Sequence, residues 1–228
     1  MTMLLHTQGL AAQRGERLLF RGLNLTLNAG EVVWLRGRNG RGKTSLLRIL
    51  AGLSTPAEGS VGVSGPSGHS PISPRDSAAR GDMIYIGHAN ALKDDLSASE
   101  ALDFLARVHG QAPSPASILA ALTRMGVAGH AQAIVRTLSQ GQRRRVALAR
   151  LALSQACESS EASNESGAAR IWLLDEPFDA LDDVGVNTLN GLLSEHAQRG
   201  GTALLTSHQA LVLQDPQPRV VNLDTDAS

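Results

Sequence analysis

The chain contains 228 residues, 42% of them apolar, and its 21 basic residues are balanced by 21 acidic ones. This composition can form a buried core but gives no net charge that would attract nucleic acid or an anionic membrane. The single cysteine, Cys157, excludes an internal disulfide and is typical of the cytosol. No apolar run approaches a membrane-spanning length, and the N-terminus lacks a signal-peptide pattern, so we expect any membrane role to depend on a partner.

Strands and helices alternate along the first part of the chain. The apolar pattern predicts antiparallel strands over residues 4–12 and 23–27 and a buried strand over residues 31–36. A first helix is predicted over residues 43–51, with Gly52 closing it. A buried strand followed directly by a helix is the usual start of an α/β domain.

The rest of the chain is predicted to continue this pattern after a helical interruption. Residues 64–81 are rich in Ser, Pro and Gly and read as a long exposed connection. A strand over residues 83–86 precedes an Ala- and Leu-rich helical stretch over residues 97–154, and strands return at residues 171–174 and 203–205. This order predicts an α/β fold in which a parallel core sheet is interrupted by a helical insertion.

A glycine-rich loop follows the buried strand. Residues 37–44 read Gly-Arg-Asn-Gly-Arg-Gly-Lys-Thr, a complete G-x-x-x-x-G-K-[ST] phosphate loop for a nucleoside triphosphate with Mg²⁺. Backbone N–H groups of such a loop surround the β-phosphate, Lys43 reaches the β and γ oxygens, and the Thr44 hydroxyl binds Mg²⁺. A glycine-rich turn before an ordinary helix is the structural alternative. The predicted nucleotide-binding residues are Gly37, Arg38, Asn39, Gly40, Arg41, Gly42, Lys43, Thr44 and Ser45.

Two carboxylates follow the apolar strand at residues 171–174. The strand is expected to deliver Asp175 to the sheet edge beside the phosphate loop, where it can hold Mg²⁺ through water. Glu176 then takes the position of a base facing the attacking water. Helix capping or plain surface charge is the alternative, and the upstream phosphate loop favours the catalytic interpretation.

A third motif consists of Leu138, Ser139, Gln140, Gly141 and Gln142, followed by Arg-Arg-Arg-Val-Ala-Leu-Ala-Arg. It resembles the L-S-G-G-Q signature and R-V-A-L-A-R helix of the ATP-binding cassette family, with Gln140 in place of the first glycine. Ser139 can cap this helix, whose free N–H groups, with the flexible Gly141, can bind a γ-phosphate presented from outside. The resemblance implies that a facing subunit supplies this phosphate, so that two chains form a homodimer with two ATP molecules between them.

The resemblance covers nearly the whole chain. Asp182, in Phe-Asp-Ala-Leu-Asp, is similar to the aspartate that links the two ATP sites across the dimer. His208, in Leu-Thr-Ser-His, is similar to the switch histidine that contacts the γ-phosphate and water. A lone histidine after a strand is more often structural, but the order of the motifs favours a catalytic role for His208 beside Glu176.

Two positions depart from the family pattern. Arg14 stands where most cassette proteins have an aromatic residue that stacks on adenine, and a guanidinium can also stack on a purine. His88 stands at the glutamine of the coupling loop, which senses Mg²⁺ and water and abuts the membrane subunit. An imidazole accepts a hydrogen bond only when it is neutral, so coupling is expected to depend on pH.

These features together resemble the ATP-binding subunits of haem exporters in bacterial cytochrome c maturation. The resemblance implies a peripheral subunit on the cytoplasmic face of the bacterial inner membrane, paired with integral-membrane permease subunits. The chain contains no Cys-x-x-Cys-His, so we expect its relation to haem or a haem carrier to be indirect. A cassette ATPase that drives cofactor assembly, of the iron-sulfur type, is the alternative because it also lacks a membrane span.

The predicted organisation is a single cassette domain over residues 1–228. Its catalytic α/β core, with an antiparallel β subdomain, is expected over about residues 1–87 and 155–228, and a helical signature subdomain over about 88–154. The polar stretch 155–169 is expected to loop out without a role. Three consecutive arginines at residues 143–145 fan around their helix, so no nucleic-acid partner is expected.

Overall fold

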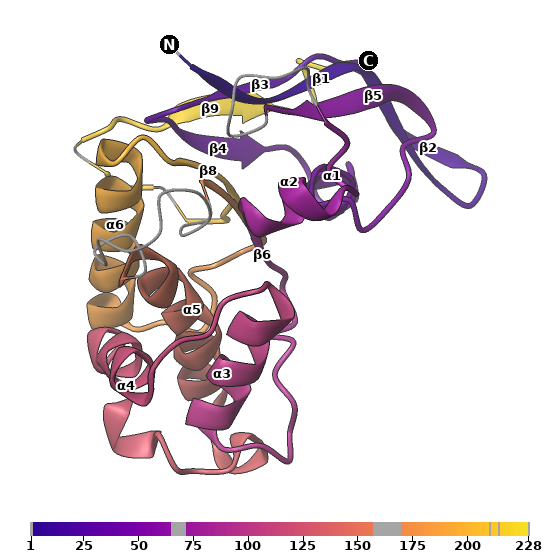
Figure 1. Cartoon of the computed structure of the whole chain (residues 1–228). Helices are drawn as coiled ribbons and strands as arrows, with labels where there is room; N and C mark the ends of the chain where they lie inside the picture. Colours follow the sequence, from indigo (N-terminus) through magenta and orange to yellow (C-terminus); the bar gives the residue numbers. More distant parts are fainter. Residues whose placement is uncertain (1, 65–71, 157–169, 210, 214, 228) are drawn as a thin grey trace. The chain divides into compact units, whose positions relative to one another are not determined.

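The computed structural model describes the chain except for residues 1, 65–71, 157–169, 210, 214 and 228 (Figure 1). The chain divides into two compact units. The sheet unit comprises Met1–Tyr85, Ala169–Glu176 and Ser194–Ser228, and the helical unit comprises Ile86–Ala168 and Pro177–Leu193. Residues 177–193 therefore cluster with the helical stretch, whereas the sequence suggested that they belong to the catalytic core.

An antiparallel sheet forms one layer of the sheet unit. It contains β1 (Met3–Arg14), β2 (Arg17–Leu23), β3 (Thr26–Asn28) and β5 (Glu58–Val63), in the order β2-β1-β3 with β5 also paired to β1 (Figure 1). The predicted strand over residues 23–27 was wrong, because the chain turns between β2 and β3. Side chains bind the backbone at this turn: Asn24 Oδ1 accepts the Gly9 N–H at 2.9 Å, and Thr7 Oγ1 accepts the Leu25 N–H at 2.8 Å.

The second sheet of this unit contains β4 (Val32–Arg36), β6 (Met83–Ile86), β7 (Ile171–Leu174), β8 (Thr202–Thr206) and β9 (Arg219–Asn222). Its order is β6-β7-β8-β4-β9, and β4 runs parallel to β8 and β9 while β7 runs parallel to β8. Every residue of β7 and β8 is buried, as expected for strands covered on both faces. The carboxyl ends of β7, β8, β4 and β9 therefore meet at one edge of the sheet.

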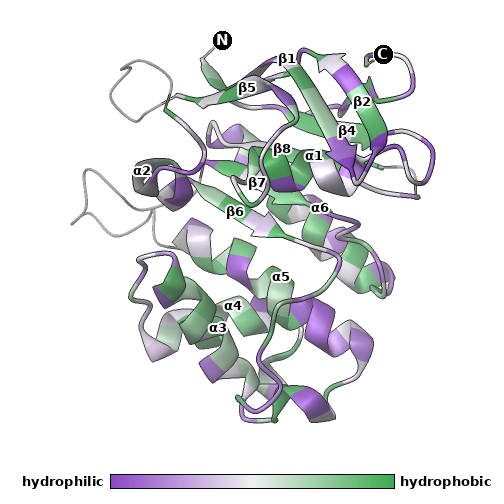
Figure 2. Cartoon of the chain, turned by 90° about the vertical axis from the view of Figure 1, so that its right-hand side faces the viewer, coloured by the Kyte–Doolittle hydropathy of each residue, from purple (hydrophilic) through white to green (hydrophobic). Residues whose placement is uncertain are grey.

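The core of the sheet unit includes helix α1 (Lys43–Leu50), which buries Leu46, Leu47, Ile49 and Leu50. Figure 2 shows apolar residues running along β1, β4 and β8. The predicted exposed connection over residues 64–81 was wrong in its described second half. Ile72 forms an antiparallel bridge with Val63, and α2 (Ser77–Gly81) contains the fully buried Ala79.

The helical unit contains α3 (Ala98–Val108), α4 (Pro115–Arg124), two 3₁₀ turns, η1 (Ala128–His130) and η2 (Val135–Thr137), and α5 (Gln140–Ala156). A capping box starts α3, because the Ser97 hydroxyl accepts the Glu100 N–H while the Glu100 carboxylate accepts the Ser97 N–H. Helix α6 (Asp183–Gln198) begins in this unit and ends in the sheet unit. Among the described residues, no helix is long and apolar enough to cross a membrane.

Helix α5 continues beyond the boundary that the sequence suggested. Gln155, expected at the start of a polar loop, is a buried helical residue whose amide donates to the Leu192 carbonyl at 3.1 Å. A buried amide with a good acceptor contributes to packing, so the expectation that this position has no role was wrong. The remainder of the predicted loop, residues 157–169 with Cys157, lies outside the described residues.

Candidate nucleotide site and signature helix

The phosphate loop connects β4 to α1 in the conformation that its glycines allow. Gly40 and Gly42 have φ angles of 79° and 98°, in the left-handed region that favours glycine. Gly42 also lies under the β1–β2 hairpin, since a Cβ there would approach the Leu19 Cβ to 3.0 Å. Lys43 folds back along the loop, and its Nζ donates to the Gly37 carbonyl at 2.7 Å. The exposed Thr44 lies in the first turn of α1, where no side chain caps the helix.

The two carboxylates after β7 are positioned by a residue of β8. The register of β7 against β8 sets Leu174 opposite Leu205, which brings Thr206 beside Asp175. The fully buried Thr206 hydroxyl donates to Asp175 Oδ1 at 2.9 Å and accepts the Glu176 N–H at 2.8 Å. Glu176 has a φ of 47°, an uncommon left-handed conformation for a residue with a side chain. Sequence reasoning missed Thr206, because its hydroxyl matters only once the strand register is known.

His208 and Glu176, the two residues predicted to be catalytic, lie next to each other. The His208 backbone N–H donates to Glu176 Oε2 at 3.1 Å, and His208 Nε2 lies 3.6 Å from Glu176 Oε1. Tyr85 is half-buried, and both its burial and the nearby charge of Asp175 raise the pKa of its phenol. The phenol therefore stays protonated at neutral pH beside the carboxylate.

A cavity of about 550 Å³ lies between the phosphate loop and the residues that follow β8. Its lining includes Gly37 and Lys43 from the loop, Trp34 from β4, and His208, which follows β8. The Trp34 indole N–H donates to the Ser207 carbonyl at 3.2 Å, which fixes one wall. The exposed Arg14 is not part of this lining and lies at the β1–β2 hairpin opposite Arg17.

The cavity also contains a carboxylate that sequence reasoning missed. Asp224 follows β9, a strand that was not predicted, and it accepts hydrogen bonds from the phosphate-loop residues Arg38 and Arg41. The Arg38 N–H and then the two guanidinium groups hold the pKa of Asp224 below its usual range. The available signal was an apolar run, Val-Val-Asn-Leu, ending in Asp224, the same pattern that precedes Asp175.

The signature residues start α5 in the helical unit. Ser139 and Gln142 form a reciprocal cap, because Ser139 Oγ accepts the Gln142 N–H at 3.2 Å and Gln142 Oε1 accepts the Ser139 N–H at 2.9 Å. Leu138 is buried and Gln140 is exposed. Gly141, which the sequence suggested as a flexible residue, lies in α5, where a Cβ would stand 2.7 Å from the Ala180 carbonyl oxygen.

The other two predicted residues of this unit each lie beside a charged side chain. Asp182 Oδ1 accepts the Gly185 N–H at 2.9 Å and pairs with Arg145. The Gly185 N–H and the Arg145 charge lower the pKa of Asp182. His88 is exposed, and its Nδ1 lies 3.6 Å from Asp179 Oδ2.

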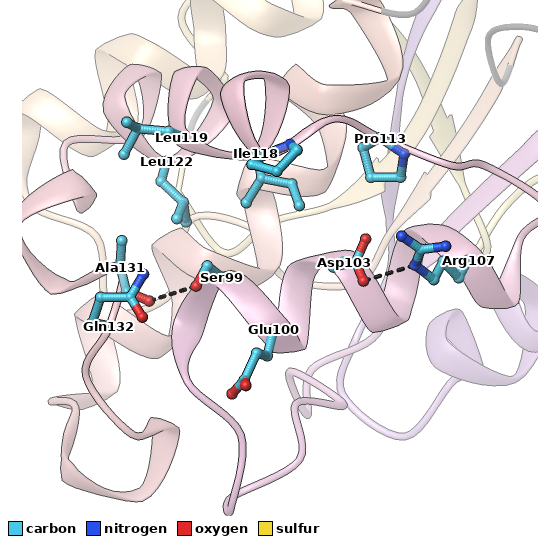
Figure 3. Close-up of a pocket in the computed structure, with 11 residues that line it drawn as sticks. Ser99, Glu100, Asp103, Arg107, Pro113, Ile118, Leu119, Leu122, Ala131 and Gln132 are labelled. Carbon is cyan, nitrogen blue, oxygen red and sulfur yellow. Dashed lines mark hydrogen bonds and ion pairs between the residues drawn. The ribbon is translucent and has the colours of Figure 1, made fainter.

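A second hollow, of about 430 Å³, lies in the helical unit between α3 and α4 (Figure 3). Ile118, Leu119 and Leu122 of α4 form its apolar side, and α3 contributes the pair in which Arg107 Nε donates to Asp103 Oδ2 at 2.7 Å. None of the residues predicted from the sequence to be functional lines it.

The sheet order, the glycine-rich loop after β4 and the acidic pair after β7 define a phosphate-loop nucleotide-binding protein of the α/β class. Residues 20–158 match the ABC transporter family. The chain belongs to this family, and it is therefore an ATP-binding ATPase of the cassette type, with the fold that its sequence predicted.

The chain is similar over most of its length to two curated relatives. The cytochrome c biogenesis ATP-binding export protein CcmA of Albidiferax ferrireducens is 44% identical, with 88% of this chain and 87% of that protein aligned. The protein named CcmA 2 of Cupriavidus metallidurans is 42% identical over 98% of this chain and 97% of its own. A solved ATP-binding cassette, a dimeric post-hydrolysis state bound to ADP and Pi, aligns with a TM-score of 0.72 at 24% identity, covering 90% of this chain and 88% of that one.

Proposed function

We propose that this chain is the ATP-hydrolysing subunit of an export complex in cytochrome c biogenesis, and that the complex handles haem. The observation that carries the proposal is the meeting of the phosphate loop, Glu176 and His208 at the carboxyl ends of adjacent parallel strands. Its biological setting is supported by similarity, over most of the chain, to relatives named as cytochrome c biogenesis export proteins.

In this proposal the phosphate loop binds the triphosphate. The loop residues from Gly37 to Thr44, with Ser45, present backbone N–H groups to the phosphates, and Lys43 supplies the positive charge. Among the described residues there is no cluster of three or more His, Cys, Asp or Glu side chains that could hold a metal alone. The exposed Thr44 hydroxyl and Asp175 suit an ion that takes its other ligands from phosphates and water, which is how Mg²⁺ is usually held. When bound, Mg²⁺ neutralises charge that develops on the phosphates.

Glu176 is proposed to orient the attacking water and to accept its proton. The water oxygen attacks the γ-phosphorus in line, the bond to the β–γ bridging oxygen breaks, and ADP leaves with that electron pair. The His208 N–H donates to one oxygen of Glu176, and its imidazole Nε2 lies 3.6 Å from the other oxygen. The imidazole is proposed to contact the same γ-phosphate. Arg14 remains a proposed contact to the base, from an exposed position on the hairpin.

The signature helix is proposed to act on the ATP of a second copy of the chain. Ser139 is exposed at the start of α5, where a helix N-terminus favours an anion. Gly141 lets this turn pack against the Ala180 carbonyl. Asp182 accepts the Gly185 N–H in the first turn of α6 and pairs with Arg145. Leu138, Gln140 and Gln142 complete the motif. ATP would then join two chains head to tail.

The transport role requires partners in the membrane. We propose integral-membrane permease subunits that contact the coupling loop at His88, with this chain bound peripherally at the cytoplasmic face of the bacterial inner membrane. The exposed position of His88 beside Asp179 supports a contact from outside the chain. Haem, or a haem carrier, would be handled by those partners.

The catalytic proposal is tested by two substitutions. Glu176→Gln should bind ATP with nearly unchanged affinity but lose at least tenfold in steady-state hydrolysis, because the amide cannot accept the proton. Lys43→Ala should lose ATP binding, measured by equilibrium titration with MgATP. Glu176→Gln with wild-type turnover would remove Glu176 from the mechanism.

The transport proposal is tested separately. The chain is expressed with and without candidate integral-membrane permease subunits, and membranes are isolated. Recovery with the membranes only when the permeases are present, together with stimulated ATP hydrolysis, is expected. Equal recovery in the soluble fraction in both cases would contradict the membrane partnership and would leave the ATPase assignment standing.

A further inference from the structure

The phosphate loop carries two arginines besides Lys43, and a single carboxylate binds both. Asp224 Oδ1 accepts from Arg41 Nε at 2.8 Å and from Arg38 Nε at 3.4 Å, while Oδ2 accepts the Arg38 backbone N–H at 2.9 Å. Arg38 is mostly exposed, whereas the Arg41 side chain is only 32% exposed. Arg41 is therefore the principal charged partner of Asp224.

The position of Asp224 follows from the strand register. β9 pairs with β4 so that Asn222 lies opposite Arg36, and the Leu223 N–H donates to the Arg36 carbonyl at 3.0 Å. Leu223 is fully buried, and Asn222 Oδ1 accepts the Asp224 N–H at 3.0 Å. The carboxylate is thus directed at the loop by a buried neighbour and by backbone hydrogen bonds.

Asp224 gives this edge of the sheet a fourth functional contribution. β4 supplies the phosphate loop, β7 supplies Asp175 and Glu176, β8 supplies His208, and β9 supplies Asp224. Asp224 lines the same cavity as Lys43 and His208. A carboxylate in that cavity would repel a polyphosphate unless a nearby cation compensates its charge.

We propose that Asp224 is a positioning residue of the nucleotide site that forms a charge-balanced pair with Arg41. Asp224 holds the Arg41 guanidinium beside the phosphate loop. The Arg41 charge in turn offsets the repulsion between the Asp224 carboxylate and a bound triphosphate. The inference rests on the proposed function, in which this loop receives ATP. It adds to the nucleotide site a residue that lies outside the phosphate loop and is separate from Asp175, Glu176 and His208.

The test compares Arg41→Ala, Asp224→Asn and the double variant by equilibrium titration of the full chain with MgATP. Arg41→Ala removes the principal charged partner of the carboxylate and leaves only the mostly exposed Arg38, so the Kd for ATP should rise about tenfold, a change of about 1.4 kcal/mol. The double variant should return to within about twofold of wild type, because it removes both charges. Asp224→Asn alone should bind ATP at least as tightly as wild type, and its Kd should depend more steeply on salt because Arg41 is freed.

A matched control pair lies at the amino-terminal ends of the same two strands, away from the nucleotide site. Arg219, the first residue of β9, pairs with Glu31, just before β4, with 2.9 Å between Nη2 and Oε2. Arg219→Ala and Glu31→Gln should leave the Kd for ATP within about twofold of wild type. Thermal melting of all variants verifies that each is folded.

The outcomes separate this inference from the proposed function. If Arg41→Ala binds ATP like wild type, or if the double variant is no better than Arg41→Ala, the pair does not balance charge in the site. Weaker ATP binding by Asp224→Asn would show that Asp224 only holds the phosphate loop in place, and this result would also contradict the charge balance. If Lys43→Ala retains full ATP affinity, the loop is not the nucleotide site, and the proposed function fails.

Discussion

At the scale of single residues, the Thr206 hydroxyl links the two carboxylates that follow β7. It donates to Asp175 and accepts from the Glu176 backbone, so one oxygen atom orients a proposed metal ligand and a proposed base together. The residue is fully buried, and water cannot replace these hydrogen bonds. Its removal should therefore alter geometry at both carboxylates.

Thr206→Val should lower steady-state ATP hydrolysis by about 10- to 100-fold, the effect of about 1–3 kcal/mol from a buried hydrogen-bonding group left unpaired. The Kd for ATP should change less than threefold, because Lys43 and the loop are untouched. Thr206→Ser keeps the hydroxyl and should retain most of the activity. Equal turnover in the Val and Ser variants would contradict the positioning role.

At Gly141, a steric contact opposes the usual preference of a helix for alanine over glycine. Alanine normally stabilises a helix interior over glycine by about 1 kcal/mol. A Cβ at Gly141 would lie 2.7 Å from the backbone oxygen of Ala180, so Gly141→Ala should instead lower the free energy of unfolding by about 1–3 kcal/mol. Denaturant unfolding of the purified variant measures this difference.

The matched control is Gly191, which lies within α6 and has open space, free of other atoms within 4 Å, where a Cβ would stand. Gly191→Ala should raise the unfolding free energy by up to about 1 kcal/mol. A stabilising effect of both substitutions would show that the Ala180 loop moves aside without cost.

At the scale of elements, β7 and α6 meet in a stacked aromatic pair within the sheet unit. The Trp172 and His196 rings lie 3.8 Å apart at an angle of 6°. Gly201 makes room for the imidazole, because a Cβ there would collide with the His196 ring. Burial lowers the pKa of His196 to about 4. The folded protein therefore contains this histidine in its neutral form.

The sign of the resulting pH dependence follows from linkage. An unfolded histidine titrates near 6.5, so below that pH the unfolded state takes up a proton that folded His196 does not bind until about pH 4. The unfolding free energy should fall as the pH decreases through this window, by at most about 1.4 kcal/mol per pH unit from this group. Stability from neutral His196 is fully present above pH 6.5.

Denaturant unfolding of wild type and His196→Phe between pH 7.5 and 4 measures the contribution. Phenylalanine can stack on Trp172 and has no proton to bind, so the variant should lose less stability on acidification. His109 in the helical unit has its pKa lowered to about 4 by burial and the Arg150 charge, so wild type alone would mix both groups. Parallel curves for the two proteins would exclude His196 as the titrating group.

Four of the five strands of the second sheet, β4, β6, β7 and β8, were predicted because buried strands are short apolar runs bounded by glycine or polar residues. β4 and β7 follow this rule. β9 escaped prediction because its apolar run is short: Arg219 and Val220 are exposed, and the polar Asn222 interrupts the run. β2 escaped because register shifts in its pairing with β1 interrupt the alternation of buried residues.

The same contrast applies to the candidate site. Three parts of the site could be recognised in the sequence because each is a contiguous motif with fixed spacing: the phosphate loop, the acidic pair and the signature. Thr206 and Asp224 could not be found this way, since their contacts depend on the alignment of β8 with β7 and of β9 with β4. Only the paired strands bring such residues together.

At the scale of the whole molecule, the proposed contributions to hydrolysis divide between the two compact units. The phosphate loop, Glu176 and His208 belong to the sheet unit, and Ser139, Gly141 and Asp182 belong to the helical unit. This division allows nucleotide binding and subunit association to be perturbed independently. Each unit can be altered while the other serves as an internal control.

Glu176→Gln with MgATP should form a stable dimer, detectable by sedimentation velocity, because binding proceeds while hydrolysis stops. Adding Ser139→Arg should abolish this dimer, since a bulky side chain would occupy the start of α5, while the affinity of the monomer for ATP stays within about threefold. An ATP-dependent dimer that persists with Ser139→Arg would show that the signature helix does not receive the second nucleotide.

The hydrogen bond from Lys43 to the Gly37 carbonyl has a consequence for the rate of nucleotide capture. The ammonium group has three donors, and the Gly37 carbonyl accepts from one of them. The bond therefore links the two ends of the loop and leaves the other two donors available to a phosphate. Conformational entropy of the loop is then lost when the protein folds, and little further ordering is needed when ATP arrives. Association should therefore proceed in a single kinetic phase that is proportional to ATP concentration, with no slow isomerisation after encounter.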